Sequence, residues 1–294
     1  MIKPLNHLLS KLSVQIWKTL SLSPSSIKEA IASLIAHVVI SLNLRRIRIA
    51  KKNISLCFPA LDSGSQNKLL QETIKSSLLG FLDIGFAWWA SPKIFQSKIK
   101  YTNLSHFTDA LKSNKGIILY TGHFAPLDVG ARAISLLTPT YTLYRPNESV
   151  FLEDLIIKNR NAYSSGAIPR DNMRHMIKAL KNKKAVWYAP DQNYGLKNSV
   201  FSYFMGVLAA TSTATTKIAS LSDAIVLPFK CVRTKDGYEI SFKSIIENFH
   251  RMNPSEGTQL LNNVLSDMVK EHPEQYNWIH RRFKDTPDGT NFYK

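Results

Sequence analysis

The stretch that decides the fold is "GIILYTGHFAPLDVGARA", residues 116–133. Its first part is an apolar run with the length of a buried strand, and this run ends just before His123. Pro126 suits the first position of a following helix, because the missing backbone N–H costs nothing there. The stretch therefore predicts a strand, a turn that carries a histidine, and a helix with Asp128 in its first turn.

The same alternation of strand and helix continues outward from this stretch. The pattern predicts strands at 116–121, 140–144, 185–189, 225–232 and 238–245, and helices at 66–90, 126–137, 150–163, 172–180, 210–221 and 256–269. The last two strands are joined by the turn sequence "TKDG", which indicates a hairpin. Strands that alternate with helices predict an α/β fold with a mostly parallel mixed sheet flanked by helices.

Polar segments follow three of these strands. They are "TGHF" after the first strand, "YRPN" after the second and "APDQNYG" after the strand at 185–189. Sites in such sheets gather at the carboxyl ends of the strands, so we expect these segments to meet at one edge.

Residues 1–60 are expected to form an N-terminal helical, basic and membrane-associating segment, and residues 61–294 the catalytic domain. Apolar residues at helical spacing mark two amphipathic helices: Leu5, Leu8, Leu9, Leu12, Ile16 and Leu20 in the first, and Ile27, Ile31, Leu34, Ile35, Val38 and Leu42 in the second. Trp17 suits a membrane interface, and the basic run "RRIRIAKK" follows directly. The alternative is that both helices pack on the catalytic domain.

Composition limits the remaining possibilities. Lysine and arginine number 38 against 21 acidic residues, a net charge of +17 that indicates an anionic partner. Cys57 and Cys231 are too few for a disulfide framework or a cysteine-rich zinc site. The N-terminus lacks a clean signal-peptide core, and the charge-free segment 30–44 is shorter than the roughly 20 residues that span a bilayer. We therefore expect neither secretion nor a transmembrane helix.

His123 and Asp128 are expected to act together as a general base and the carboxylate that orients it. A carboxylate on one imidazole nitrogen fixes the tautomer while the other nitrogen removes a proton. Taken alone, a histidine at a strand end is more often structural, and a first-turn aspartate is favoured by the helix dipole. The placement of the pair between a strand and a helix favours the catalytic interpretation.

The sequence contains no protein nucleophile beside this base. There is no G-x-S-x-G turn, and neither cysteine has a plausible base near it in sequence. A histidine base without a nucleophile suits deprotonation of a substrate hydroxyl, which then attacks an activated acyl group. The pattern favours O-acyl transfer.

Further candidate residues are cationic. Arg160 continues an apolar helical stripe with Leu152 and Ile156, so its guanidinium is expected to face inward with Asp191 as partner, or else to extend to solvent from the helix end. The donors expected to bind substrate phosphate are Arg145, Arg281, Arg282 and Lys284. No metal-ligand spacing, Walker loop or G-x-G-x-x-G motif is present, so no metal or cofactor is expected.

Five ordered motifs carry a resemblance to a known family. They are "GHFAPLDVGAR", "YRPN", "WYAPDQNYGLKNSVF", "AATSTATTKIA" and "PEQYNWIHRRFKDTPDG", and the upstream "RRIRIAKKNISLCFP" joins them. In this order and spacing they resemble the late acyltransferases of lipid A biosynthesis, most of all the lauroyltransferase branch. Many members carry glutamate where this chain has Asp128.

The resemblance implies transfer of a fatty acyl chain from acyl carrier protein to the 3-hydroxyl of an acyl chain on a Kdo-bearing lipid A precursor. It places this reaction at the cytoplasmic face of the inner membrane of a Gram-negative cell. The essential residues of the family match His123, Asp128, Arg160 and Asp191. The expected partners are acyl carrier protein, the anionic precursor and the membrane surface.

Two other functions stay open. One is an acyltransferase of the same superfamily that acts on a glycerolipid or another membrane acceptor. The other is a non-catalytic basic module that binds membrane or nucleic acid, although no recognisable nucleic-acid motif is present and we expect no nucleic-acid partner. Acyl-chain length and oligomeric state are not determined by the sequence.

Overall fold

The computed structural model describes residues 2–293, and their side chains from residue 9 onward. Its main sheet has seven strands in the order β1-β9-β8-β2-β5-β3-β4. Neighbouring strands are parallel except for the antiparallel pair β8 and β9. The strands are β1 (Ile99–Thr102), β2 (Ile117–Tyr120), β3 (Thr140–Tyr144), β4 (Gly166–Pro169), β5 (Ala185–Tyr188), β8 (Ile225–Arg233) and β9 (Tyr238–Phe242). The predicted α/β fold with a mostly parallel mixed sheet is confirmed.

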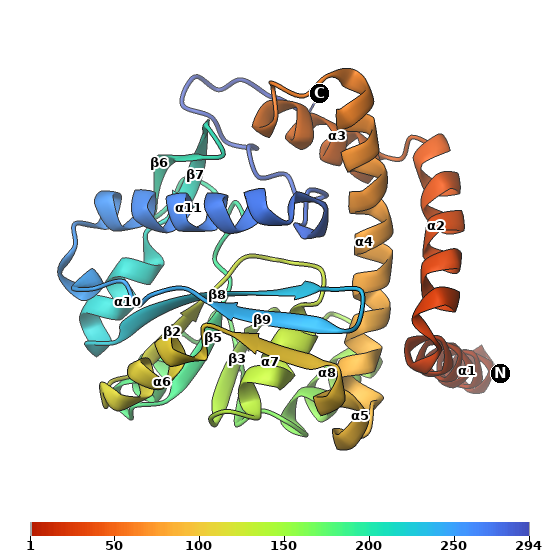
Figure 1. Cartoon of the computed structure of the whole chain (residues 1–294), viewed down its shortest axis with the longest axis horizontal. Coiled ribbons are helices and arrows are strands. Elements are labelled where there is room, and N and C mark those ends of the chain that lie inside the picture. The colour runs from red at the N-terminus through yellow and green to blue at the C-terminus, as the bar shows by residue number, and fades with distance from the viewer. Residues whose placement is uncertain (1, 294) are drawn as a thin grey trace.

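Helices cover both faces of this sheet, with α11 on one face and α6 and α7 on the other (Figure 1). The helices after residue 60 are α4 (Ser63–Trp89), α5 (Pro92–Ser97), α6 (Leu104–Lys112), α7 (Leu127–Ser135), α8 (Val150–Asn161), α9 (Met173–Lys181), α10 (Ala214–Ser222) and α11 (Pro254–Glu271).

Strand β2 separates two apolar cores. Ile118 and Tyr120 face the core that contains α11, whereas Ile117 and Leu119 face the core that contains α6 and α7. All four residues are buried, as expected for a central strand covered on both faces. The strand therefore holds its carboxyl end, and the loop with His123, in a fixed place.

The sequence interpretation was wrong at residues 210–212. The predicted helix 210–221 starts there, but these residues belong to strand β7 (Val207–Ser212), antiparallel to β6 (Ser199–Phe204). Met205 and Gly206 form the turn of this hairpin, both with positive φ. Helix α10 begins only at Ala214. The sequence also left β1, α6 and β4 unpredicted.

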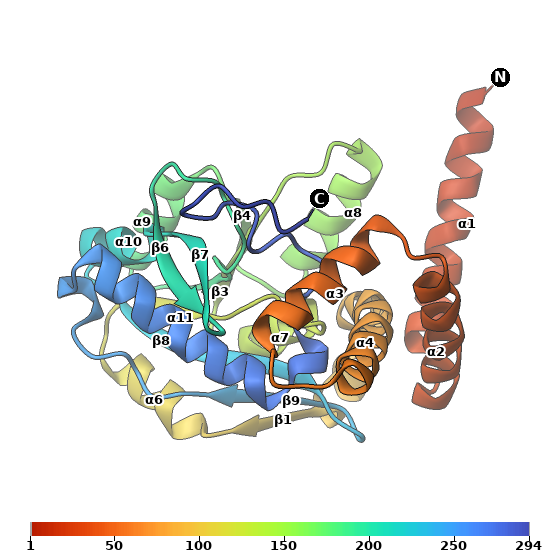
Figure 2. The same cartoon turned by 90° about the horizontal axis from the view of Figure 1, so that it is seen from above.

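Three helices precede α4: α1 (Ile2–Leu22), α2 (Ser25–Ser41) and α3 (Arg45–Cys57). Helix α1 projects from the side of the molecule, and α2 runs beside α4 (Figure 2). The basic run forms α3, which places Ile47, Ala50 and Ile54 in the core shared with α11.

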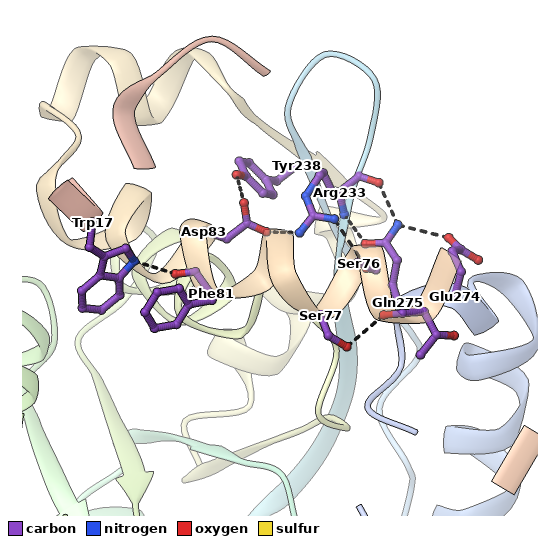
Figure 3. Close-up of polar contacts among 10 residues, drawn as sticks. Trp17, Ser76, Ser77, Phe81, Asp83, Arg233, Tyr238, Glu274 and Gln275 are labelled. Carbon is purple, nitrogen blue, oxygen red and sulfur yellow. Dashed lines mark hydrogen bonds and ion pairs between the residues drawn. The ribbon is translucent and has the colours of Figure 1, made fainter. Parts of the chain in front are cut away.

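Trp17 docks α1 onto α4 rather than standing free. Its ring stacks on Phe81 at 4.5 Å and lies against the rings of Trp88 and Trp89, and its indole N–H donates to the carbonyl of Phe81 at 2.9 Å (Figure 3). Trp17 is therefore half-buried against α4, and its place at a membrane interface stays a prediction.

Most of the predicted apolar faces of α1 and α2 are exposed. The exposed residues are Leu9, Leu12 and Ile16 on α1 and Ile27, Leu34, Ile35, Val38 and Leu42 on or just after α2. The side chains of Leu5 and Leu8 lie outside the described residues. Within residues 2–293, no single helix is long and apolar enough to cross a bilayer, although α2 and α3 together, bent by 92°, reach that length and composition.

Candidate active site

His123 lies in the loop between β2 and α7, and the C-terminal part of the chain holds this loop in place. The backbone N–H of Asn277 donates to the carbonyl of His123 at 3.0 Å, and that of Ala125 donates to the carbonyl of Gln275 at 2.8 Å. The histidine is thus positioned by a strand end on one side and by a segment about 150 residues later on the other.

The imidazole of His123 is bound by Asp191. Nδ1 lies 2.5 Å from Oδ1 of Asp191, and the backbone N–H of His123 donates to Oδ2 at 2.9 Å. The hydroxyl of Tyr276 also donates to Oδ2, at 2.9 Å. The side chain of Asp191 is only 1% exposed and that of His123 is 28% exposed. The carboxylate is therefore fixed and buried, while the ring keeps one side open.

The register of the sheet explains this pairing. Tyr120 of β2 lies opposite Tyr188 of β5, and His123 and Asp191 each follow three residues after these partners. In adjacent parallel strands, residues that follow a paired position by the same number of steps lie near each other. The predicted contact between His123 and Asp128 is wrong: the carboxylate beside the imidazole is that of Asp191.

Electrostatics favour a charged carboxylate and a more basic imidazole. Burial alone would raise the pKa of Asp191, but the charge of His123 and the hydrogen bonds from His123 and Tyr276 lower it to about 2. Burial alone would lower the pKa of His123, but the Asp191 carboxylate raises it above the ordinary value. Nδ1 donates to the carboxylate in the neutral ring, which leaves Nε2 as a proton acceptor.

Asp128 instead holds Arg160 of α8. The guanidinium donates from Nε and Nη2 to the two carboxylate oxygens, both at 2.9 Å. The hydroxyl of Tyr163 and the indole N–H of Trp88 also donate to Asp128, at 3.0 and 3.2 Å. Arg160 faces inward as predicted, but the expected partner Asp191 is wrong, and Asp128 takes its place.

This cluster fixes the charges of both partners. Burial alone would raise the pKa of the Asp128 carboxyl, but Arg160 and the donors from Trp88 and Tyr163 lower it. The pKa of Arg160 is raised, because the attraction of Asp128 exceeds the effect of burial. Asp128 thus ties the start of α7 to α8 and, through Trp88, to the end of α4.

His123 opens into a cleft of about 270 Å³. The three predicted strand-end segments meet here, because His123, Arg145, Gln192 and Tyr194 all line the cleft. Arg170, which follows β4, lines it as well. The expectation that these segments gather at one edge of the sheet is confirmed.

A larger apolar cavity of about 950 Å³ adjoins this cleft between α1, α2, α4 and α8. Ile156 and Arg160 line both spaces. Leu152 lines the larger one, so the predicted apolar stripe of α8 faces this cavity. An elongated apolar group in the large cavity would therefore bring its end close to Asp128, Arg160 and the cleft of His123.

The other predicted phosphate donors lie elsewhere. Arg282 is 2% exposed, and its guanidinium donates to the carbonyl of Ala210 at 2.8 Å and to the hydroxyl of Thr211 at 2.7 Å. Its assignment to substrate is corrected to a structural role in holding β7. Arg281 lies over the ring of Tyr293 at 5.5 Å, and Lys284 is exposed. Neither lines the cleft of His123.

Sequence reasoning missed several residues around the site. Tyr276, Trp88 and Tyr163 donate to the two buried carboxylates, and Nε2 of His280 accepts the backbone N–H of Asn193 at 3.2 Å. Burial lowers the pKa of His280 to about 4, so this ring is a neutral acceptor. Tyr276 and His280 are the first and last residues of the motif segment "YNWIH", and this segment was the signal for them.

Comparison with known proteins places the chain among enzymes of one pathway. The profile of the family described as bacterial lipid A biosynthesis acyltransferase matches residues 3–285. The lipid A biosynthesis acyltransferase of Haemophilus influenzae is 31% identical over 94% of this chain and 90% of its own length. The lipid A biosynthesis lauroyltransferase of Escherichia coli is 33% identical over 83% of this chain and 81% of its own. The palmitoleoyltransferase of the same organism is 32% identical over 83% of this chain and 81% of its own.

Proposed function

Because the chain belongs to the bacterial lipid A biosynthesis acyltransferase family, we propose that it transfers a fatty acyl chain from acyl carrier protein to a hydroxyl of a Kdo-bearing lipid A precursor. The acceptor is the 3-hydroxyl of an acyl chain already on the precursor. The single observation that carries the proposal is the geometry of His123, whose Nδ1 is bound by Asp191 and whose ring opens into the cleft.

The chemical step uses His123 as a general base. Nε2 removes the proton of the acceptor hydroxyl, and the oxygen attacks the thioester carbonyl carbon. The tetrahedral intermediate then collapses, the carbon–sulfur bond breaks, and the thiolate takes the proton back from the imidazolium. Asp191 stabilises the imidazolium between these two proton transfers. General-base help of this kind contributes about 10²- to 10⁴-fold.

Direct transfer fits the two cysteines of the chain. Cys57 and Cys231 are both buried, and burial raises the pKa of each thiol. A buried neutral thiol is a poor nucleophile. We therefore propose no acyl-enzyme intermediate.

The apolar cavity of about 950 Å³ is the proposed site of an acyl chain. Its volume lies in the range of ligand pockets. For the acyl chain itself we propose lauroyl, by analogy with the lauroyltransferase of Escherichia coli. The palmitoleoyltransferase is almost equally similar, so identity does not separate the two chain lengths.

Arginines at the cleft suit anionic partners. Both arginines line it: Arg145 follows β3, and Arg170 follows the neighbouring edge strand β4. We propose that they receive the acidic carrier protein or the phosphates of the acceptor. The exposed apolar residues of α1 and α2 support binding at a membrane surface, with the cytoplasmic face of the inner membrane as the proposed location.

The test is an assay of the purified full chain in detergent with lauroyl-carrier protein and two acceptors, Kdo-bearing lipid A precursor and lysophosphatidate. The proposal expects one added lauroyl group on the precursor by mass spectrometry, and none with the His123→Ala variant. Product on lysophosphatidate alone would show a glycerolipid enzyme. Absence of product on both acceptors would contradict acyl transfer.

A further inference from the structure

A second cavity of about 440 Å³ lies on the other side of α4 from the catalytic cleft. Leu79, Asp83 and Phe86 of α4 face this cavity, whereas Phe81 and Trp88 face the apolar cavity of the active site. The second cavity shares no lining residue with either space around His123. It is therefore a separate feature, enclosed by the turn between α1 and α2, by α4 and by the β8–β9 hairpin.

Basic side chains from three parts of the chain converge on this cavity. They are Lys28 of α2, Lys98 after α5, Arg233 at the end of β8, and Lys235 in the hairpin. Of the carboxylates that line it, Asp83 is engaged by Arg233 and by the hydroxyl of Tyr238 (Figure 3).

Lys28 is a partly buried charge with no carboxylate in direct contact. Glu29, its neighbour, pairs instead with Lys75 at 3.8 Å. Within residues 2–293, no carboxylate forms an ion pair with the ammonium of Lys28, which lies 5.6 Å from the centre of the Phe86 ring. Burial lowers the pKa of Lys28, against the opposing effect of Asp83. A half-buried ammonium in this state gains from a bound anion.

The start of α2 adds backbone donors to the same place. Its N-cap is Pro24, which makes no side-chain cap, and its first turn holds no acidic residue. Ser23, Pro24 and Ser25 line the cavity. Free N–H groups and the helix dipole favour an anion at such a terminus. Ser21 also lines the cavity, and its buried hydroxyl has no hydrogen-bond partner among the described residues.

Two exposed apolar residues lie at the rim of the cavity. Leu22 and Ile94 line it and are 43% and 55% exposed. Exposed apolar residues beside a basic cavity match an anionic lipid, which carries its phosphate and its acyl chains side by side. A free phosphate ion would leave these apolar residues without a partner.

We propose that this cavity binds the phosphate of an anionic phospholipid headgroup, with Lys28, Lys98 and the N-terminus of α2 as its donors. The site holds the start of α2, beside the end of α1, on the bilayer at a point separate from the catalytic cleft. It does not take part in the chemistry at His123.

The experiment measures sedimentation of the full chain with phosphatidylcholine vesicles, with and without phosphatidylglycerol. The test variant is Lys28→Gln with Lys98→Gln. The matched control is Lys93→Gln with Lys100→Gln, which removes the same charge from two exposed lysines that flank Lys98 but do not line the cavity. Arg233 is left unchanged because it holds Asp83.

The proposal expects the test variant to lose about tenfold in affinity for the phosphatidylglycerol vesicles, and the control to lose about twofold or less. All three proteins should bind pure phosphatidylcholine equally and keep the same acyl transfer in detergent. Equal losses in both variants would overturn the proposal, because surface charge alone would then explain binding. A different outcome would overturn the lipid as ligand. In it, the wild type and the test variant bind phosphatidylglycerol vesicles equally, while inorganic phosphate raises the melting temperature of the wild type but not of the test variant.

Discussion

His123 and Asp191 are joined by a 2.5 Å contact between Nδ1 and Oδ1, although 68 residues separate them in the chain. Asp128, only five residues from His123, binds Arg160 with both carboxylate oxygens. The site therefore contains two separate pairs, one that holds the base and one that joins α7 to α8.

Replacement of Asp191 should change the pH profile of the reaction. The carboxylate raises the pKa of His123, so catalysis needs a pH above that raised value for the ring to be neutral. In Asp191→Asn the charge is lost and the pKa of His123 falls. The acidic limb of the kcat/KM profile should then move to lower pH, while maximal turnover drops about 10²- to 10⁴-fold. The control is Asp128→Asn, which should leave the limb in place. A shift in the control but not in Asp191→Asn would contradict the assignment.

Asp128 and Arg160 should be strongly coupled in stability. Asp128→Asn leaves a buried guanidinium without its counterion, which costs about 3–5 kcal/mol of unfolding free energy. A double-mutant cycle with Arg160→Gln in urea should give a coupling of about 1–3 kcal/mol. The matched cycle on the exposed pair Asp109 and Lys112 should give less than about 1 kcal/mol. Equal couplings in the two cycles would show that the buried pair has no special role.

Gly122→Ala should disturb the base without unfolding the protein. A Cβ at this position would lie 2.6 Å from Cδ1 of Leu265 and 3.2 Å from Oδ2 of Asp191. Either the buried side chain of Leu265 or the loop must shift, and because Leu265 is fully buried we expect the loop to move and to change the contact between His123 and Asp191. We expect kcat to fall more than tenfold, with little change in KM, in an assay at saturating donor. Gly64→Ala, where the added Cβ meets only Oδ1 of Asp62 at 3.1 Å, far from the active site, is the control and should keep full turnover. Unchanged kcat in Gly122→Ala would argue against this geometry.

Substitutions of Arg282 and Arg145 should affect different quantities, the stability of the fold in one case and substrate binding in the other. Arg282→Gln removes buried hydrogen bonds to β7 and should lower the unfolding free energy by about 1–3 kcal/mol, without raising KM. Arg145→Gln, at the cleft, should raise KM severalfold and leave the melting temperature unchanged. A raised KM in Arg282→Gln together with an unchanged KM in Arg145→Gln would show that Arg282 binds substrate and Arg145 does not.

The strands predicted most accurately are those whose carboxyl ends lead into the active site. Strand β3 was predicted with its observed bounds, and β2 and β5 within one residue at each end, because short runs of apolar, aromatic and β-branched residues stop at polar turns. The hairpin of β6 and β7 was missed, because alanine and threonine next to a real helix were read as part of that helix. The signal in Met205–Gly206, a turn between alternating segments, was overlooked.

The four predicted site residues do lie together, but their pairing could not be predicted. Proximity in sequence favoured His123 with Asp128. The observed pairing depends on β5 being the neighbour of β2, and strand order is a tertiary property that periodicity does not contain. Once that order is known, the equal spacing from Tyr120 to His123 and from Tyr188 to Asp191 gives the contact directly.

The most direct test of the central claim is an NMR titration of the ¹⁵N-labelled imidazole of His123 in the full chain, assigned with His123→Gln. The account predicts a neutral ring protonated at Nδ1, with a pKa above the ordinary value of about 6.5. That pKa should fall in Asp191→Asn and stay unchanged in Asp128→Asn. A midpoint that responds to Asp128 and ignores Asp191 would contradict the account.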